Sequence, residues 1–324
     1  MDWHGELTRR VAARYLREHG PMSEGARQEL MGAVAADVDS FVSDPADRAF
    51  ALVAQAQADL AKASADDEFL SDDEYMASRA RRLARLCAAC DEALSIDPGA
   101  TDAALIRLLA TEADALEHVT ALRALDERLR TEAPAEAPAG PVDAWADVFW
   151  RPALRVRAAL AVTALDAANV SMALGCARSL LGVMPGDELG MGGTAALALA
   201  RLEDEDGFNE LDARLGRRGN AWTNLARTLL LFKLDRLPAA RRALTGFRSL
   251  NEGAAYALLR PTYVETYLPC RPEFAPGSFE EAVLAVHEAD PVVVDAPDFV
   301  NWASEQPGVL DDAVAFARSN GMDW

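Results

Sequence analysis

The clearest pattern in the chain is a helical spacing of small and apolar positions that stops at prolines. Ala173, Ala177 and Leu180 are four and three residues apart, which places them on one face of a helix. Pro185 follows them, and a proline pushes the residue before it out of the α region. We therefore expect a helix that ends just before Pro185, and another that ends before Pro98.

The same reading predicts helices along most of the chain. Gly20-Pro21 and Asp44-Pro45 are breaks between them, and Ser278 with Glu281 has the spacing of a capping box at a helix start. Beyond these, we expect helices over 6–19, 23–41, 45–64, 101–113, 115–130, 188–202, 206–216, 297–304 and 309–318. Only 7% of the residues are aromatic, and Ala and Leu dominate, which suits packed helices better than sheets. The predicted fold class is all-α.

The middle of the chain resembles the tetratricopeptide-repeat superfamily, with degenerate repeats. Pro185 stands where such a repeat ends, and Leu160, Ala161 and Trp222 stand at positions of its first helix. The resemblance covers roughly residues 74–252. It implies an α-solenoid, in which antiparallel helix pairs stack into a right-handed superhelix with a concave groove and need caps at both ends.

Three regions follow from this resemblance and from shifts in composition. Residues 1–73 are an expected N-terminal helical cap, 74–252 the helix-pair stack, and 253–324 a proline-broken loop with a helical C-terminal cap. The stretch 131–142 is rich in Pro and Ala and reads as a linker inside the stack.

Charge limits the classes of partner. The formal net charge of -20 argues against nucleic acid, because phosphates need clustered Lys and Arg. Residues 150–252 nevertheless hold 14 basic and 11 acidic groups. Solvated surface accounts for this distribution, and so does a stack that presents arginines to an acidic or C-terminal peptide. Both interpretations stay open.

The chain gives no sign of a membrane or secreted protein. We find no run of 18 uncharged apolar residues, and residues 1–6 lack the layout of a signal peptide. The four cysteines lack the density of a disulfide framework, which fits a reduced compartment. We expect a cytoplasmic protein without membrane contact.

Patterns that carry chemistry are weak. Cys87 and Cys90 have the spacing of a metal or redox pair but no second pair, so buried thiols on a helix are the better interpretation. The four histidines are scattered, and the glycines around 182–193 have no Lys-Ser/Thr after them. The acidic runs lack the spacing of a calcium loop, and no nucleophile elbow occurs. We expect no enzyme activity, no cofactor and no metal.

The resemblance implies which residues would contact a partner. Thr223, Asn224 and Arg227 correspond to first-helix positions that line the groove in related proteins, and Arg155 does so in an earlier repeat. Asparagine and arginine there can hold a peptide backbone or a terminal carboxylate. Ordinary exposed polar residues are the competing interpretation.

The predicted function is a non-catalytic scaffold that binds a peptide or helix of a partner protein in a concave groove. One alternative is an enzyme whose site lies where Tyr256, Tyr263, Tyr267, His287 and nearby carboxylates converge. The other is a self-assembling module that forms a homo-oligomer, because an uncovered repeat end pairs readily with a copy of itself.

Overall fold

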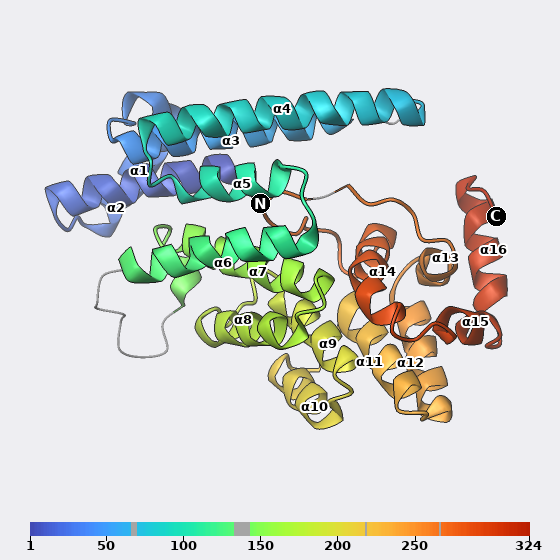
Figure 1. Cartoon of the computed structure of the whole chain (residues 1–324). Helices are drawn as coiled ribbons and strands as arrows, with labels where there is room; N and C mark the ends of the chain where they lie inside the picture. The colour runs from blue at the N-terminus through green and yellow to red at the C-terminus, as the bar shows by residue number, and fades with distance from the viewer. Residues whose placement is uncertain (66–69, 133–142, 218, 266) are drawn as a thin grey trace. The chain divides into compact units, whose positions relative to one another are not determined.

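The structure is a computed structural model that describes residues 1–65, 70–132, 143–217, 219–265 and 267–324 (Figure 1). Every regular element in these residues is a helix: sixteen are α-helices, and two are short 3-10 helices. The all-α prediction is confirmed for this part of the chain. No helix within it combines the length and the apolar character that crossing a membrane requires.

The helices form two compact units. The first contains residues 1–156 and 268–270, and the second contains 157–267 and 271–324, so the division falls inside α7 (Arg151–Asp166). Most of the predicted linker at 131–142 lies outside the described residues. The predicted boundaries at 73 and 252 separate caps from a stack, which is a different division, and they stay predictions.

The first unit is built around two long helices. Along the chain its α-helices before α7 are α1 (Trp3–His19), α2 (Glu24–Ala36), α3 (Pro45–Ala65), α4 (Asp72–Ile96), α5 (Thr101–Ala110) and α6 (Ala115–Glu132). Here α3 packs along α4, while α5 contacts both of them and α1 contacts α3. Gly20, with φ 83, follows the last residue of α1, and residues 20–23 connect α1 to α2 at the predicted Gly20-Pro21 break.

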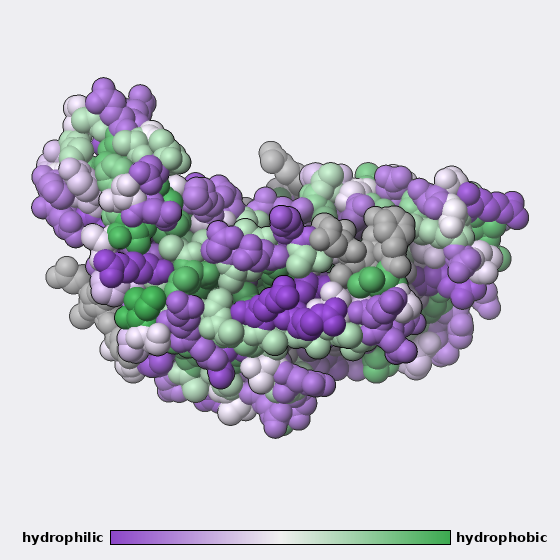
Figure 2. All heavy atoms as spheres, turned by 90° about the horizontal axis from the view of Figure 1, so that it is seen from above, coloured by the Kyte–Doolittle hydropathy of each residue, from purple (hydrophilic) through white to green (hydrophobic). Residues whose placement is uncertain are grey.

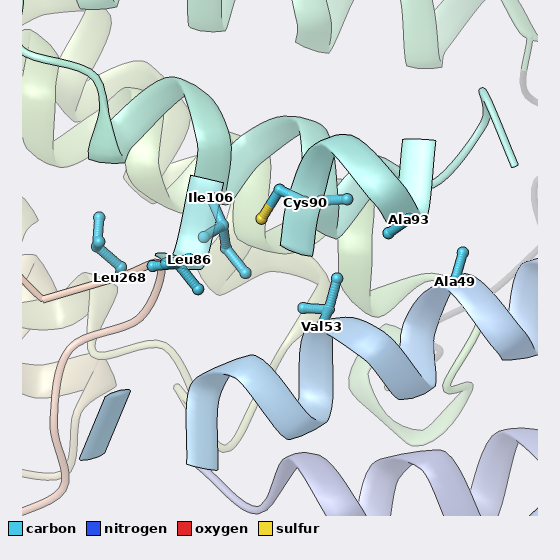
Figure 3. Close-up of a cluster of buried hydrophobic side chains, with 8 residues drawn as sticks. Ala49, Val53, Leu86, Cys90, Ala93, Ile106 and Leu268 are labelled. Carbon is cyan, nitrogen blue, oxygen red and sulfur yellow. The ribbon is translucent and has the colours of Figure 1, made fainter. Parts of the chain in front are cut away.

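The core between α3, α4 and α5 is apolar. Figure 3 shows Val53 from α3, Leu86 and Cys90 from α4, and Ile106 from α5 turned toward one another. Leu268, from the segment that returns to this unit, packs into the same cluster. Cys90 is fully buried, which agrees with the interpretation of this thiol as a small core residue.

The second unit contains residues 157–166 of α7 and the helices that follow. These are α8 (Val170–Val183), α9 (Met191–Arg201), α10 (Glu205–Arg214), α11 (Ala221–Lys233), α12 (Leu237–Leu250), α13 (Ala254–Leu259), α14 (Phe279–Val293), α15 (Phe299–Ser304) and α16 (Val309–Asn320). Successive helices from α8 to α12 contact each other, and α9 also contacts α11. The face predicted for α8 is confirmed, since Ala173, Ala177 and Leu180 are all fully buried.

Helix α14 adds contacts between segments that are far apart in the sequence. It lies against α11 and α9 although it follows them by dozens of residues (Figure 1). Ser278 caps it as predicted, with its Oγ accepting from the Glu281 N–H at 3.2 Å. The Glu281 carboxylate, however, accepts from the Gly277 N–H at 2.5 Å and not from the cap residue, so the reciprocal half of the box is displaced by one residue.

A glycine sets the distance between α9 and α11. A Cβ atom at Gly193 would stand 2.9 Å from Cγ of Trp222, closer than packed carbon atoms come. Glycine at this position therefore allows the two helices to approach closely. Trp222 therefore lies between α9 and α14, the helix that packs on α9 and α11.

Candidate functional site

Three of the residues predicted to bind a peptide lie on α11. Thr223 is buried and closes the capping box of this helix: its N–H donates to Asn220 Oδ1 at 3.0 Å, and its Oγ1 accepts from the Asn220 N–H at 2.8 Å. Its polar atoms therefore stabilise the start of α11.

Asn224 and Arg227 keep part of their surface. Asn224 is half-buried, and Arg227 is 36% exposed while its guanidinium is paired with Asp212 at 2.9 Å. The same guanidinium lies 4.9 Å from the ring centre of Phe208. Both residues could reach a partner only beside these contacts, and their peptide-binding role stays a prediction.

Arg155, the fourth predicted residue, belongs to the first unit and is completely buried. Its guanidinium donates to both oxygens of Asp102, at 2.7 Å each, and to both oxygens of Glu6, at 2.9 and 3.1 Å. Arg151 shares one Glu6 oxygen at 3.1 Å. The repeat register predicts that the Arg155 side chain lines the groove. In the structure this side chain is buried inside the first unit, where a peptide cannot reach it.

Electrostatics in this cluster favours the charged forms. Burial alone would raise the pKa of Glu6, but the hydrogen bonds and charges of Arg155, and then those of Arg151, outweigh it and hold the pKa below its ordinary value. Trp3 lies against the cluster, with its ring centre 5.2 Å from the Arg155 guanidinium carbon. The arrangement fixes α1 to α5 and α7 and leaves no carboxylate free to act as a base.

In the second unit, the face of α9 and α11 that meets α14 is occupied by a polar cluster around Glu288. Trp222 Nε1 donates to Oε2 of this carboxylate at 2.6 Å, and the Tyr267 hydroxyl donates to Oε1, also at 2.6 Å. Arg271 binds it through Nε at 2.9 Å and Nη2 at 2.5 Å. Nη2 also donates to Oγ1 of Thr194 on α9, at 3.1 Å.

Both oxygens of the Glu288 carboxylate are fully hydrogen-bonded. Each Glu288 oxygen accepts two hydrogen bonds, and burial, followed by the Glu288 charge, raises the pKa of Tyr267 well above its ordinary value. A neutral tyrosine and a fully bound carboxylate hold a segment in place and are poorly suited to proton transfer. We interpret the cluster as the clamp that fastens α14 to α9 and α11.

The residues of the alternative enzyme site lie in different surroundings. Tyr267 belongs to the Glu288 clamp, whereas the Tyr256 hydroxyl donates to the backbone oxygen of Asp323 at 3.1 Å. Tyr263 is 66% exposed, and His287 is exposed on α14. Tyr267 and Tyr256 are therefore bound to different groups, a side chain and a backbone oxygen.

Cys87 and Cys90 offer little reactivity. Burial raises the pKa of the Cys90 thiol to about 12, and burial also raises the pKa of Cys87. In the part of the chain that the structure describes, no three His, Cys, Asp or Glu side chains are grouped so that they could hold a metal ion.

A groove between α3 and α4 is the candidate site that the sequence did not reveal. It has a volume of about 350 Å³ and an apolar floor, to which both helices contribute. The floor residues are Ala56, Leu60, Ala63, Leu86 and Ala89. In Figure 2, which views the molecule from the side of these helices, hydrophobic patches lie between strongly hydrophilic residues.

The edge of this groove is mainly basic. Lys62 and Arg85 are exposed, and Arg82 is buried with Nη1 donating to Ser78 at 3.2 Å. Asp59 is the acidic residue of the lining, and its carboxylate accepts from Gln55 at 2.9 Å. The spacing of Arg82, Arg85 and Leu86 on one predicted helix was the available signal, since it places basic side chains beside an apolar position.

Comparisons with protein-family models, with curated proteins and with solved structures gave no match to this chain.

Proposed function

We propose that the chain is a non-catalytic scaffold, and that the groove between α3 and α4 binds a helical segment of a partner protein. The observation that carries the proposal is an open groove with an apolar floor and a basic edge, between two long helices of a strongly acidic chain. An amphipathic helix laid into such a groove buries its apolar face and leaves its polar face in water.

The dimensions support a helix as the ligand. Helices α3 and α4 contain 21 and 25 residues. Their lining residues span only 56–63 and 82–89, so at about 1.5 Å per residue the groove accompanies about two turns of a third helix. Lys62, Arg82 and Arg85 against Asp59 favour a partner helix with acidic residues along its flanks.

For the second unit we infer a tetratricopeptide-like stack. We propose that α9 with α10, and α11 with α12, are two such helix pairs; the contact between α9 and α11 supports this arrangement. In a solenoid of this kind the first helices line the groove, and here α14 lies on both of them. The chain's own helix therefore takes the place of a groove ligand, which favours the first unit as the site for a partner.

Peptide binding tests the proposal directly. Fluorescence anisotropy of labelled amphipathic helices, with one apolar face and either Glu or Lys on the flanks, is measured with the full chain. We expect the acidic helix to bind more tightly, and Arg85→Glu to weaken it about three- to tenfold at low salt, because each edge charge is worth up to about 1 kcal/mol.

The control is Arg81→Glu, which makes the same change at an exposed position of α4 outside the groove. This variant should leave the affinity within about twofold, because Arg81 does not line the groove and its exposed charge cannot pair with the flanks of the bound helix. Equal binding of acidic and basic helices, or equal losses in the two variants, would show that the groove is not the site.

A further inference from the structure

A second cavity of the first unit has a volume of about 200 Å³ and lies where α1, α3, α5 and the start of α7 meet. Ala49, Phe50 and Val53 from α3 form part of its apolar wall, and Phe149 forms another part. Two polar features face this apolar space, the side chain of Arg10 and the first turn of α5.

Arg10 is a buried cation without a hydrogen bond to any residue that the structure describes. Its side chain is 10% exposed, and Nε and Nη1 are completely buried with no hydrogen-bond partner among these residues. The nearest carboxylate oxygen, from Asp47, is 4.0 Å away, because Asp47 is held by Arg14 at 2.7 Å. The Phe50 ring centre lies 4.3 Å from the guanidinium carbon, so aromatic surface covers the cation while its donors remain unused.

The first turn of α5 supplies further donors to the same cavity. Its N-cap residue, Ala100, has no side chain that could accept a hydrogen bond, and the first bond of the helix runs from the Ala104 N–H to the Ala100 oxygen. The backbone N–H groups of Thr101, Asp102 and Ala103 have no acceptor among the described residues. Such a turn attracts anions through its free N–H groups and the helix dipole.

The nearby acids limit the charge of a ligand. Asp102 is bound by Arg155, Asp47 by Arg14, and Asp97 accepts from the Gly99 N–H at 2.9 Å. With these carboxylates close by, a single negative charge is tolerated better than two. The volume also lies below the roughly 300–1,000 Å³ of pockets for drug-sized ligands, which favours a small molecule.

We propose that this cavity binds a small monocarboxylate with an apolar body, and that its carboxylate lies between the Arg10 guanidinium and the first turn of α5. The apolar body contacts the side chains of α3 and Phe149. This site is separate from the α3–α4 groove, and the proposal does not depend on the function proposed for that groove.

Calorimetric titration of the full chain tests the site, with 3-methylbutanoate and benzoate as probes in a chloride buffer at up to about 10 mM, where a Kd near 1 mM is measurable. We expect each acid to bind at least about tenfold more tightly than its uncharged amide, because only the acid forms charge-assisted hydrogen bonds. Arg10→Met should abolish this preference. The matched control Arg9→Met changes an exposed arginine one residue away and should retain it.

A second variant distinguishes loss of the binding site from loss of the fold. Ala100 has φ -64 and ψ 81, close to Asp204 with φ -85 and ψ 85, whose carboxylate caps α10 by accepting from Gly207 at 2.8 Å. Ala100→Asp should therefore cap α5, raise the melting temperature and weaken the acids about tenfold or more, because its own carboxylate occupies the free N–H groups. Loss of binding together with a gain in stability is not what a damaged fold produces.

Several results would overturn the proposal. The first is the absence of saturable binding by either acid in the wild-type chain; another is equal binding of acids and amides. Unchanged affinity in Arg10→Met, or in Ala100→Asp, would show that the carboxylate lies elsewhere. The last probe is an acetylated peptide that ends in Leu with a free C-terminal carboxylate. If this peptide binds and the small acids do not, the ligand is a chain terminus and the small-molecule assignment is wrong.

Discussion

Replacement of Arg155 by Met is the most informative single change to the first unit. Methionine has a similar length and is flexible enough to fill the space, so the variant removes the charge and its hydrogen bonds with little loss of volume. It leaves Glu6 and Asp102 buried, at 1% and 4% exposure, without their shared partner. Arg151 still reaches one oxygen of Glu6.

The expected loss is large because two carboxylates are affected. Removing one partner from a buried ion pair costs about 3–5 kcal/mol, mainly because the remaining charge is desolvated and uncompensated. A domain is stabilised by about 5–15 kcal/mol in total, so this change removes a considerable part of the free energy of unfolding of the first unit. Adding Asp102→Asn to Arg155→Met should restore part of it, since Asp102 is then uncharged while Glu6 keeps its bond to Arg151.

The loss should depend on pH with a defined sign. In the wild-type chain the pKa of Glu6 is lowered, so its stabilising contribution is present above the ordinary Glu pKa of about 4.3 and fades as the pH falls below it. In Arg155→Met the buried carboxylates are penalised only while they are ionised. The difference in free energy between the two proteins is therefore greatest near pH 7 and shrinks as the pH falls through about 4.

Hydrogen exchange measured by mass spectrometry separates the two units. The free energy of opening measured from the amides of α1 and α5 should fall by about 3–5 kcal/mol, while that measured from the amides of α9 and α11 should change little. The control is Arg107→Met, which removes an ion pair with Asp91 that is about half exposed on both sides and is worth about 0–1 kcal/mol. If Arg155→Met loses no more than this control, the reasoning from burial is refuted.

Three further changes test packing and reactivity. Gly193→Ala should cost about 1–3 kcal/mol in chemical denaturation because its Cβ would overlap Trp222, whereas Gly175→Ala, on the exposed side of α8 with nothing within 4 Å, should gain about 0.5–1 kcal/mol. Trp222→Phe removes a donor to Glu288 and should cost about 1–3 kcal/mol, with no loss if the hydrogen bond is absent. Cys90, whose pKa is raised to about 12, should be alkylated by iodoacetamide only as fast as the unit unfolds, and rapid labelling in the native protein would contradict its burial.

The helices were predictable because their signals are local. Spacing over about two turns marks the buried face of α8, and a serine followed three residues later by glutamate marks the start of α14. Predicted and observed ends of the helices differ mostly by a few residues. The same local pattern does not reveal which helix covers which face, because that depends on contacts between distant segments.

The polar sites show where local reasoning fails. Arg155 meets Asp102 across 53 positions and Glu6 across 149, and a register counted along one repeat contains neither partner. Likewise, Trp222 was expected at a repeat position, but its indole N–H is committed to Glu288, 66 residues later. The groove between α3 and α4 required the structure as well, because a basic run on a helix does not say whether the adjacent apolar surface is open.

Arg10 and Arg155 are both buried in the first unit, but they differ in the hydrogen bonds that they make. Arg155 is bound by two carboxylates, whereas no hydrogen bond in the described chain involves the guanidinium of Arg10 and burial lowers its pKa. Stability alone does not account for arginine at position 10, because an apolar side chain would fill the space without burying a charge. Arg155→Met should therefore destabilise the first unit, while Arg10→Met should leave its melting temperature unchanged or raise it. If both variants lower it equally, Arg10 is a structural residue, and its missing hydrogen bonds do not await a ligand.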